Sequence, residues 1–138
     1  MQFNISVDTR DAGAAGAVLR AVRERSGGLA GVTALALPHS GTTEIACNVD
    51  SFPLDPGNRL QAAQLAADML EPVLGGHYRT RFSVIEEVVA AAAARAGTRL
   101  AGNSVIIGFT PQQAAALTLE AVASGTASLV TELSTTQM

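Results

Sequence analysis

The chain has 138 residues and a formal net charge of -3, with 48% hydrophobic and only 15% charged residues. This composition is typical of one small globular domain. All 9 residues counted as lysine or arginine are arginines, which excludes lysine-dependent chemistry such as Schiff-base formation, and the acidic balance argues against nucleic acid as a partner.

The only cysteine, Cys47, excludes an intramolecular disulfide, and its place in an alternating apolar run predicts a position in the core. The two histidines lie far apart in the sequence and form no metal motif, so we expect no metal. No apolar run has the length of a membrane span and no secretory signal opens the chain. We therefore expect a cytoplasmic protein without a membrane partner.

The first part of the chain predicts a strand, a helix and a hairpin. Apolar and polar residues alternate over residues 2–8, which is the period of a strand with one buried face. Thr9 is expected to cap a helix that ends at Gly27. Residues 32–37 and 42–50 then predict two strands joined by a turn of four residues.

The middle of the chain predicts a loop, a second helix and an extended segment. Residues 52–58 have loop composition, and residues 77–82 are polar and extended. The helix between them is expected to be shortened before Pro72, because proline disfavours helical geometry at the residue preceding it. Its apolar positions are Leu60, Ala63, Ala67, Leu70 and Leu74.

A third helix is predicted from Ser83 to Ala96. Ser83 and Glu86 have the spacing of a capping box. Between Glu87 and Arg95 the helix carries only valines and alanines, so we expect it to be buried on all sides, in the core or at a subunit contact. This pattern favours a homodimer, since two-fold dimers are the commonest oligomers.

The C-terminal part predicts a strand and a fourth helix. Residues 105–109 form a nearly continuous apolar run typical of a strand. Thr110 and Pro111 have the residue types that begin a helix, and we expect this helix to reach about Ser124. The remaining residues predict a short strand or a frayed tail.

The order of these elements predicts an α+β protein. Strand, helix, strand, strand, helix and strand in succession are typical of the ferredoxin-like βαββαβ sandwich, here with one inserted helix and an additional C-terminal helix. In this arrangement the helices cover one face of the sheet, and the first and third strands are neighbours at its centre. We expect a domain over residues 1–125 with an insertion at about 53–79, followed by a tail at 126–138.

The sheet face opposite the helices is expected to be polar. It is either solvated, the floor of a ligand site, or half of a dimer. Asn4, Glu44 and Asn48 are candidate ligand-binding residues there, although the two asparagines fit equally well a contact with each other or with a facing subunit. The side chains predicted on this face are Asn4, Ser6, Asp8, Glu44, Asn48 and Asp50.

The segment from His77 to Arg81 gathers several chemically useful side chains. In an extended chain Arg79 and Arg81 project to the same side and are suited to clamp a carboxylate. Tyr78 lies between the candidate catalytic acid or base His77 and this pair. The competing interpretation is a solvated connection between two helices. The second histidine, His39, is expected at an exposed hairpin turn.

Three segments of the chain resemble the C-terminal half of the glutamate formiminotransferases. Residues 3–37 resemble a strand of type N-I-N-L, a helix with a Gly-Gly stop and the strand that follows. Residues 44–52, EIACNVDSF, resemble the family's Q-V-S-M-N-L-x-D-Y, and residues 103–111, NSVIIGFTP, resemble G-S-E-I-V-G-L-V-P. The resemblance implies a ferredoxin-like fold that is used twice in the full transferase, which moves a formimino group from formiminoglutamate to tetrahydrofolate at the junction of its two halves.

The chain also departs from the family's pattern. The general base of the family is a histidine of the N-terminal half, which these residues do not match. Ser83 stands where the family has a histidine that opens its second helix, and Val105 stands where it has a glutamate. In an alternative alignment the family's second helix corresponds to residues 57–74, and residues 77–98 are then the insertion.

The resemblance implies a formiminotransferase-like domain that binds a folate, with tetrahydrofolate as the cofactor, or a formiminoglutamate-like ligand. Such a domain is expected to be incomplete for formimino transfer on its own and to work with a separate N-terminal-type formiminotransferase subunit. Two alternatives remain. One is a small stand-alone homodimeric enzyme of a different reaction class that uses the open sheet face as its pocket, and the other is a non-catalytic assembly module.

Overall fold

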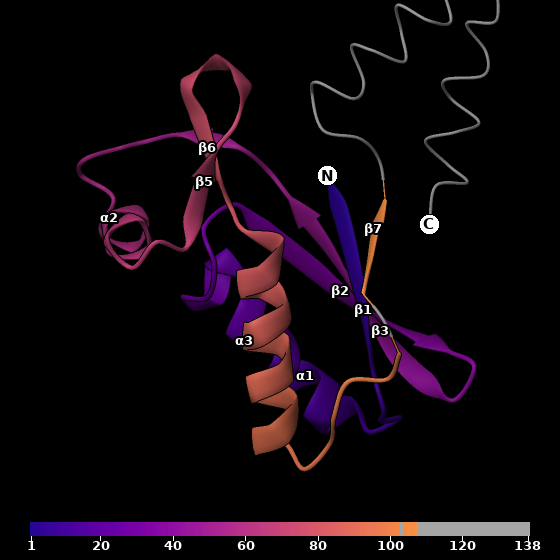
Figure 1. Ribbon diagram of the computed structural model, residues 1–138. Coiled ribbons are helices and arrows are strands. Elements are labelled where there is room, and N and C mark those ends of the chain that lie inside the picture. Colours follow the sequence, from indigo (N-terminus) through magenta and orange to yellow (C-terminus); the bar gives the residue numbers. More distant parts are fainter. Residues whose placement is uncertain (103, 108–138) are drawn as a thin grey trace, which may run out of the picture.

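The computed structural model describes residues 1–102 and 104–107, and these form an α+β structure with two antiparallel sheets (Figure 1). The larger sheet has the strand order β2-β3-β1-β7. Its strands are β1 (Gln2–Val7), β2 (Val32–His39), β3 (Thr42–Val49) and β7 (Val105–Ile107). The remainder of the expected last strand, the helix expected from Thr110 and the expected tail lie outside the described residues.

The first and third strands of the chain are neighbours, as predicted. β1 and β3 are antiparallel with Ile5 opposite Ile45, so alternate residues of both strands share one face. Helices α1 (Ala12–Val22) and α3 (Phe82–Arg95) pack against each other on that face (Figure 1). The core between the helices and the sheet includes Ile5, Val18, Val22, Ile45, Ile85 and Val89.

The hairpin between β2 and β3 is tighter than the sequence predicted. His39 is opposite Thr42 in the register, so the turn contains only Ser40 and Gly41. Both have positive φ, 46° and 86°, as the favoured two-residue hairpin turns require. Pro38 and His39 therefore belong to the end of β2 and not to the turn.

Two predicted caps are wrong. The N-cap of α1 is Asp11, whose Oδ2 accepts from the backbone N–H of Ala14 at 3.0 Å, while Thr9 Oγ1 accepts from the N–H of Asp11. Helix α3 begins one residue before the expected cap, so Ser83 lies in its first turn and the N-cap, Arg81, makes no side-chain capping hydrogen bond.

The second predicted helix is much shorter than expected. Helix α2 covers only Arg59–Ala66, and Asp68 follows with a left-handed φ of 59°. The chain then enters strand β5 (Leu70–Pro72). Leu70 is buried as a residue of this strand and not of a helix, and Leu74, which follows the strand, is exposed. The apolar spacing failed because α2 buries two glutamines, Gln61 and Gln64, instead of an apolar stripe.

The second sheet is formed within the segment that connects β3 to α3. β4 (Phe52–Pro53) and β5 both pair with β6 (His77–Thr80) in the order β4-β6-β5. The extended conformation predicted after the second helix is confirmed by β6. Two buried side chains attach this unit to the loop before β2: Gln64 bonds the backbone of Gly28 and Ala30, and Thr80 Oγ1 donates to the Ala30 carbonyl at 2.8 Å.

The third helix is not buried on all sides. Ile85, Val89, Ala92 and Ala93 face the core, but Glu86, Ala91 and Ala94 are exposed. The long alanine run permits close packing against α1 and leaves an ordinary helix surface outside. The core of this chain therefore covers only one side of the helix, and a subunit contact on its outer side stays a prediction.

Candidate functional site on the open sheet face

The sheet face opposite α1 and α3 carries a groove of about 460 Å³. Alternation along the strands places Asn4 and Ala46 together on this face, because they are register partners in β1 and β3. The groove follows the β2 side of the sheet. Its lining includes Gln2, Arg23, Arg25, Thr33, Leu35 and Asn48.

Apolar side chains of β2 share this face with the polar side chains expected from β1 and β3, and they form the floor of the groove. Leu35 is 62% exposed and Leu37 is 46% exposed, and Ala46 lies opposite Leu35 in the register. Strand β2 is apolar on both faces, since Val32 and Ala34 are buried against the helices while the two leucines point the other way. Exposed apolar side chains gathered on one face are typical of a binding surface.

Two arginines form the rim of the groove at the start of β2. Arg23 follows α1, and its Nε donates to the carbonyl oxygen of Ala34 at 3.0 Å. This hydrogen bond fixes the Arg23 guanidinium at the outer edge of β2, which is an edge strand. Arg25 is exposed. Among the described residues neither arginine forms an ion pair, so the rim presents positive charge to an anionic group.

Of the three polar residues predicted to bind a ligand on this face, only Asn48 lines the groove. Asn48 lines the groove and donates from Nδ2 to Asp50 Oδ1 at 3.3 Å. Asn4 and Glu44 lie farther along the face, where Asn4 Nδ2 donates to Glu44 Oε1. Asn4 Oδ1 is buried and has no hydrogen-bond partner in the described part of the chain. Asn4 and Glu44 thus bind each other beside the groove.

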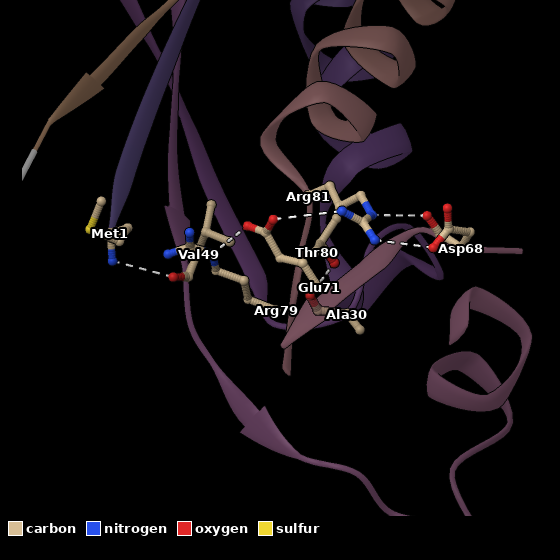
Figure 2. A network of polar contacts seen from close by, with 8 residues as sticks. All are labelled: Met1, Ala30, Val49, Asp68, Glu71, Arg79, Thr80 and Arg81. Atoms are coloured by element: carbon tan, nitrogen blue, oxygen red, sulfur yellow. Dashed lines mark hydrogen bonds and ion pairs between the residues drawn. The ribbon is translucent and has the colours of Figure 1, made fainter. Parts of the chain in front are cut away.

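Arg79 lies in β6 of the second sheet, Arg81 is the N-cap of α3, and both contact the carboxylate of Glu71. Arg79 Nε is 2.8 Å from Glu71 Oε1, and Arg81 Nη1 is 3.8 Å from Glu71 Oε2 (Figure 2). Arg81 Nη2 also pairs with Asp68 Oδ1 at 3.1 Å. The two arginines do project to the same side, and a ligand carboxylate at this place has to displace Glu71.

The other residues of that cluster are on the same strand. His77 Nδ1 lies 3.5 Å from Ser51 Oγ, and Tyr78 is opposite Phe52 in the pairing of β6 with β4. Both side chains are half-buried. Neither residue lines the groove. The two candidate regions predicted from the sequence, the open sheet face and the His77 segment, are therefore separate places in the fold.

Cys47 is a core residue, as predicted. It is fully buried among the helix-facing residues of the sheet, and burial raises the pKa of its thiol to about 12. The thiol is therefore neutral and is no nucleophile at ordinary pH. In the residues that the structure describes, no group of three or more His, Cys, Asp or Glu is placed to hold a metal ion. Within the same residues, no helix has the length and apolarity to cross a membrane.

The sequence contains part of the signal for the groove. Arg23 and Arg25 follow the first helix in the sequence, and nothing in the sequence pattern alone relates them to the strand at residues 32–37. Leu35 and Leu37 alternate with Ala34 and Ala36 in the sequence. A strand with apolar side chains on both faces is typical of a sheet that is covered on both sides. The meeting of these leucines with the two arginines at the edge of β2 depends on the topology of the sheet.

Comparison with family models, with curated proteins and with solved structures finds no match for this chain. Function is therefore inferred from the groove, the strand arrangement and the residues that resemble the formiminotransferases.

Proposed function

We propose that the chain is a formiminotransferase-like domain that binds a folate or a formiminoglutamate-like ligand in the groove on its open sheet face. The observation that carries this proposal is the combination of an apolar floor at Leu35 and Leu37 with Arg23 and Arg25 at the rim, which form no ion pair with another described residue. A groove of this kind suits a ligand that has a flat apolar body and a carboxylate.

The chemistry of the groove matches the two parts of a folate. The ring system requires a broad apolar contact and a few hydrogen-bonding groups, which the leucines, the Asn48 amide and the Gln2 amide supply. The glutamyl carboxylates require a planar cation, and the guanidinium of Arg25 is free to bind one in bidentate geometry. Formiminoglutamate is smaller and shares only the carboxylates.

A ferredoxin-like fold is part of the same proposal. It is supported by the strand order β2-β3-β1-β7, by the antiparallel pairing throughout that sheet, and by α1 and α3 on one face. In this interpretation β1-α1-β2 and β3-α3-β7 are the two halves of a split βαβ unit. The second sheet is then an insertion between β3 and α3, and α3 corresponds to the family's second helix.

The groove supports binding more strongly than turnover. Neither histidine of the chain lines it, and His77 lies instead beside Ser51 in the loop between the two sheets. General acid or base catalysis needs a titratable group within hydrogen-bond reach of the reacting atom. We therefore propose that formimino transfer needs a separate N-terminal-type subunit to supply this group, and that the present chain binds and orients the ligand.

Calorimetric titration of the full chain tests the proposal with two ligands, 5-formyltetrahydrofolate and formiminoglutamate. We expect binding of the folate and a weakening of roughly tenfold in Arg25→Ala, because one charge-assisted contact is lost. Arg95→Ala is the matched control, since Arg95 lies at the end of α3 on the other side of the sheet. Absence of binding by both ligands at saturating concentration contradicts the proposal.

An assembly module is the second candidate, and one observation favours it. Leu35 and Leu37 are both exposed on one face, and exposed apolar side chains gathered in this way are typical of a protein contact. If a protein surface covers these leucines, the open face is an interface, either in place of the ligand site or together with it.

A further inference from the structure

The open face combines an apolar centre with opposite charges at its two ends. Leu35 and Leu37 lie two residues apart on β2. Arg25 lies toward the start of β2, next to Arg23, whose Nε is fixed to the Ala34 carbonyl. Glu44 lies at the other end, where it is the register partner of Leu37. A cation near the start of β2, the two leucines, and an anion on β3 beside Leu37 thus lie together on the open face.

The charges at both ends are available for a partner. Arg25 forms no ion pair with another described residue, and the same is true of Glu44. Among the residues that the structure describes, Glu44 accepts from Asn4 with Oε1 and from no donor with Oε2, so this second oxygen is suited to accept from an arginine. An arginine fork and a carboxylate with a free oxygen are strong partners when an interface excludes water.

We propose that the surface that covers this face is a second copy of the same chain. A two-fold axis that lies in the interface and crosses β2 near Leu35 places the start of one β2 over the end of the other. Arg25 of each copy then faces Glu44 of the other copy, and the leucines of both copies meet between them. Each contact occurs twice, as a two-fold interface requires.

The backbone groups at the outer edge of β2 favour association through the face of the sheet over pairing with a strand of another molecule. An exposed edge strand ordinarily attracts another strand through its free backbone groups. Here Arg23 occupies the Ala34 carbonyl at the outer edge, and Pro38 has no N–H to donate. Part of the edge is therefore unsuited to strand pairing, whereas the apolar face of β2 is open for association.

The inference goes beyond the proposed function, because the facing copy covers the same leucines and binds the same Arg25 that a ligand would contact. Ligand binding and dimer formation at this face are therefore expected to compete. The inference does not require a ligand, so the ligand-free chain tests it separately from the proposed function.

Sedimentation equilibrium of the full, ligand-free chain at micromolar concentration is the test. We expect a species of twice 14.1 kDa. Arg25→Glu and Glu44→Arg each place like charges opposite one another and are expected to weaken the dimer roughly tenfold or more, while the double variant restores the opposite charges and the affinity. Arg95→Glu, at the end of α3, is the matched charge-reversal control and leaves the dimer unchanged.

A second variant keeps the test independent of Glu44. Leu35→Glu changes a side chain that is 62% exposed, so the fold is retained while a charge enters the centre of the interface, and the chain is expected to be monomeric. Circular dichroism checks the fold of each variant. A wild-type chain that is monomeric, or a dimer that survives Leu35→Glu and both charge reversals, overturns the inference.

Cysteine labelling of Leu35→Cys distinguishes a second copy from a segment of the same chain. The native Cys47 is buried and does not compete for the reagent. In a dimer the new thiol is protected, and the protection is lost on dilution. Protection that is independent of concentration means that a segment of the same chain covers the face, which also overturns the inference. In either case folate binding by the monomer leaves the proposed function intact.

Discussion

Arg79 and Glu71 face each other on neighbouring strands of the second sheet, with Arg79 Nε 2.8 Å from Glu71 Oε1. The guanidinium carbon of Arg79 also lies 4.7 Å from the centre of the Phe82 ring, at the start of α3. This one side chain therefore connects β5, β6 and the helix layer. The same guanidinium that is suited to hold a ligand carboxylate already holds a carboxylate of the protein.

Arg79→Ala is expected to lower the free energy of unfolding by about 2–3 kcal/mol. The Arg79 side chain is only 11% exposed, so its loss removes a cation–π contact and leaves the Glu71 carboxylate half-buried with a weaker partner. Arg81→Ala is the matched comparison. Arg81 is 35% exposed and its partner Asp68 is 88% exposed, so we expect a loss below about 1 kcal/mol.

Urea denaturation of the two variants measures this difference. Equal losses in Arg79→Ala and Arg81→Ala mean that burial and the aromatic contact add nothing to the Arg79 pair.

The sequence predicts the larger sheet well because its information is local. Phe3, Ile5 and Val7 alternate with polar residues, and this period alone determines which side of β1 is buried. The insertion was predicted poorly for the opposite reason. Gln61 and Gln64 have the composition of a solvated helix surface, yet both are buried. The partners that satisfy Gln64 are Gly28 and Ala30, more than thirty residues away in sequence.

The candidate site shows the same division between local and distant information. The extended backbone at Arg79 and Arg81 predicted that both side chains point to one side, and they do. The carboxylate that they meet, Glu71, was not predicted because the pairing of β5 with β6 replaces an expected helix. The groove likewise depends on β2 being an edge strand, which brings Arg23 beside Ala34, and strand order is a property of the whole fold.

Gln64→Ala is expected to destabilise the protein by about 2–3 kcal/mol. The Gln64 side chain accepts from the Ala30 N–H at 3.0 Å and donates to the Gly28 carbonyl at 2.8 Å. Removing it leaves two backbone groups of a buried loop without partners, which costs more than the net value of the hydrogen bonds. Leu65→Ala, at the next position of α2 and 42% exposed, is expected to cost less than about 1 kcal/mol.

Chemical denaturation compares these two variants of α2. A Gln64→Ala variant that is as stable as Leu65→Ala contradicts the role of Gln64 in attaching the second sheet to the loop before β2.

The N-termini of α1 and α3 differ in their capping, so we expect Asp11→Ala to lower the stability of the protein and Ser83→Ala not to lower it. Asp11→Ala removes the acceptor for the Ala14 N–H and is expected to cost about 1 kcal/mol of stability. Ser83→Ala removes a hydroxyl that caps nothing, since α3 begins at Phe82, and alanine has the higher helix propensity. We therefore expect Ser83→Ala to be neutral or slightly stabilising in thermal denaturation. If Ser83→Ala lowers the stability as much as Asp11→Ala does, Ser83 caps α3 as the sequence predicted.

The Cys47 thiol predicts how stability depends on pH in the alkaline range. Burial raises its pKa from 9.0 to about 12 in the folded chain. Below pH 9 the thiol is protonated in both states, and its contribution to stability is complete. Between pH 9 and about 12 the unfolded chain releases the proton while the folded chain keeps it, so the free energy of unfolding falls as pH rises, by at most about 1.4 kcal/mol per pH unit.

Cys47→Ala isolates this contribution because all other titrating groups are shared. The variant is less stable than the wild type at neutral pH, since a buried side chain is made smaller. The difference between the two proteins is expected to shrink as pH rises above 9, because only the wild type carries the thiol. Urea denaturation at pH 8 and at pH 10 measures both differences. If the difference stays constant between these pH values, the thiolate is tolerated in the fold, and the assignment of Cys47 to a dry core contact is wrong.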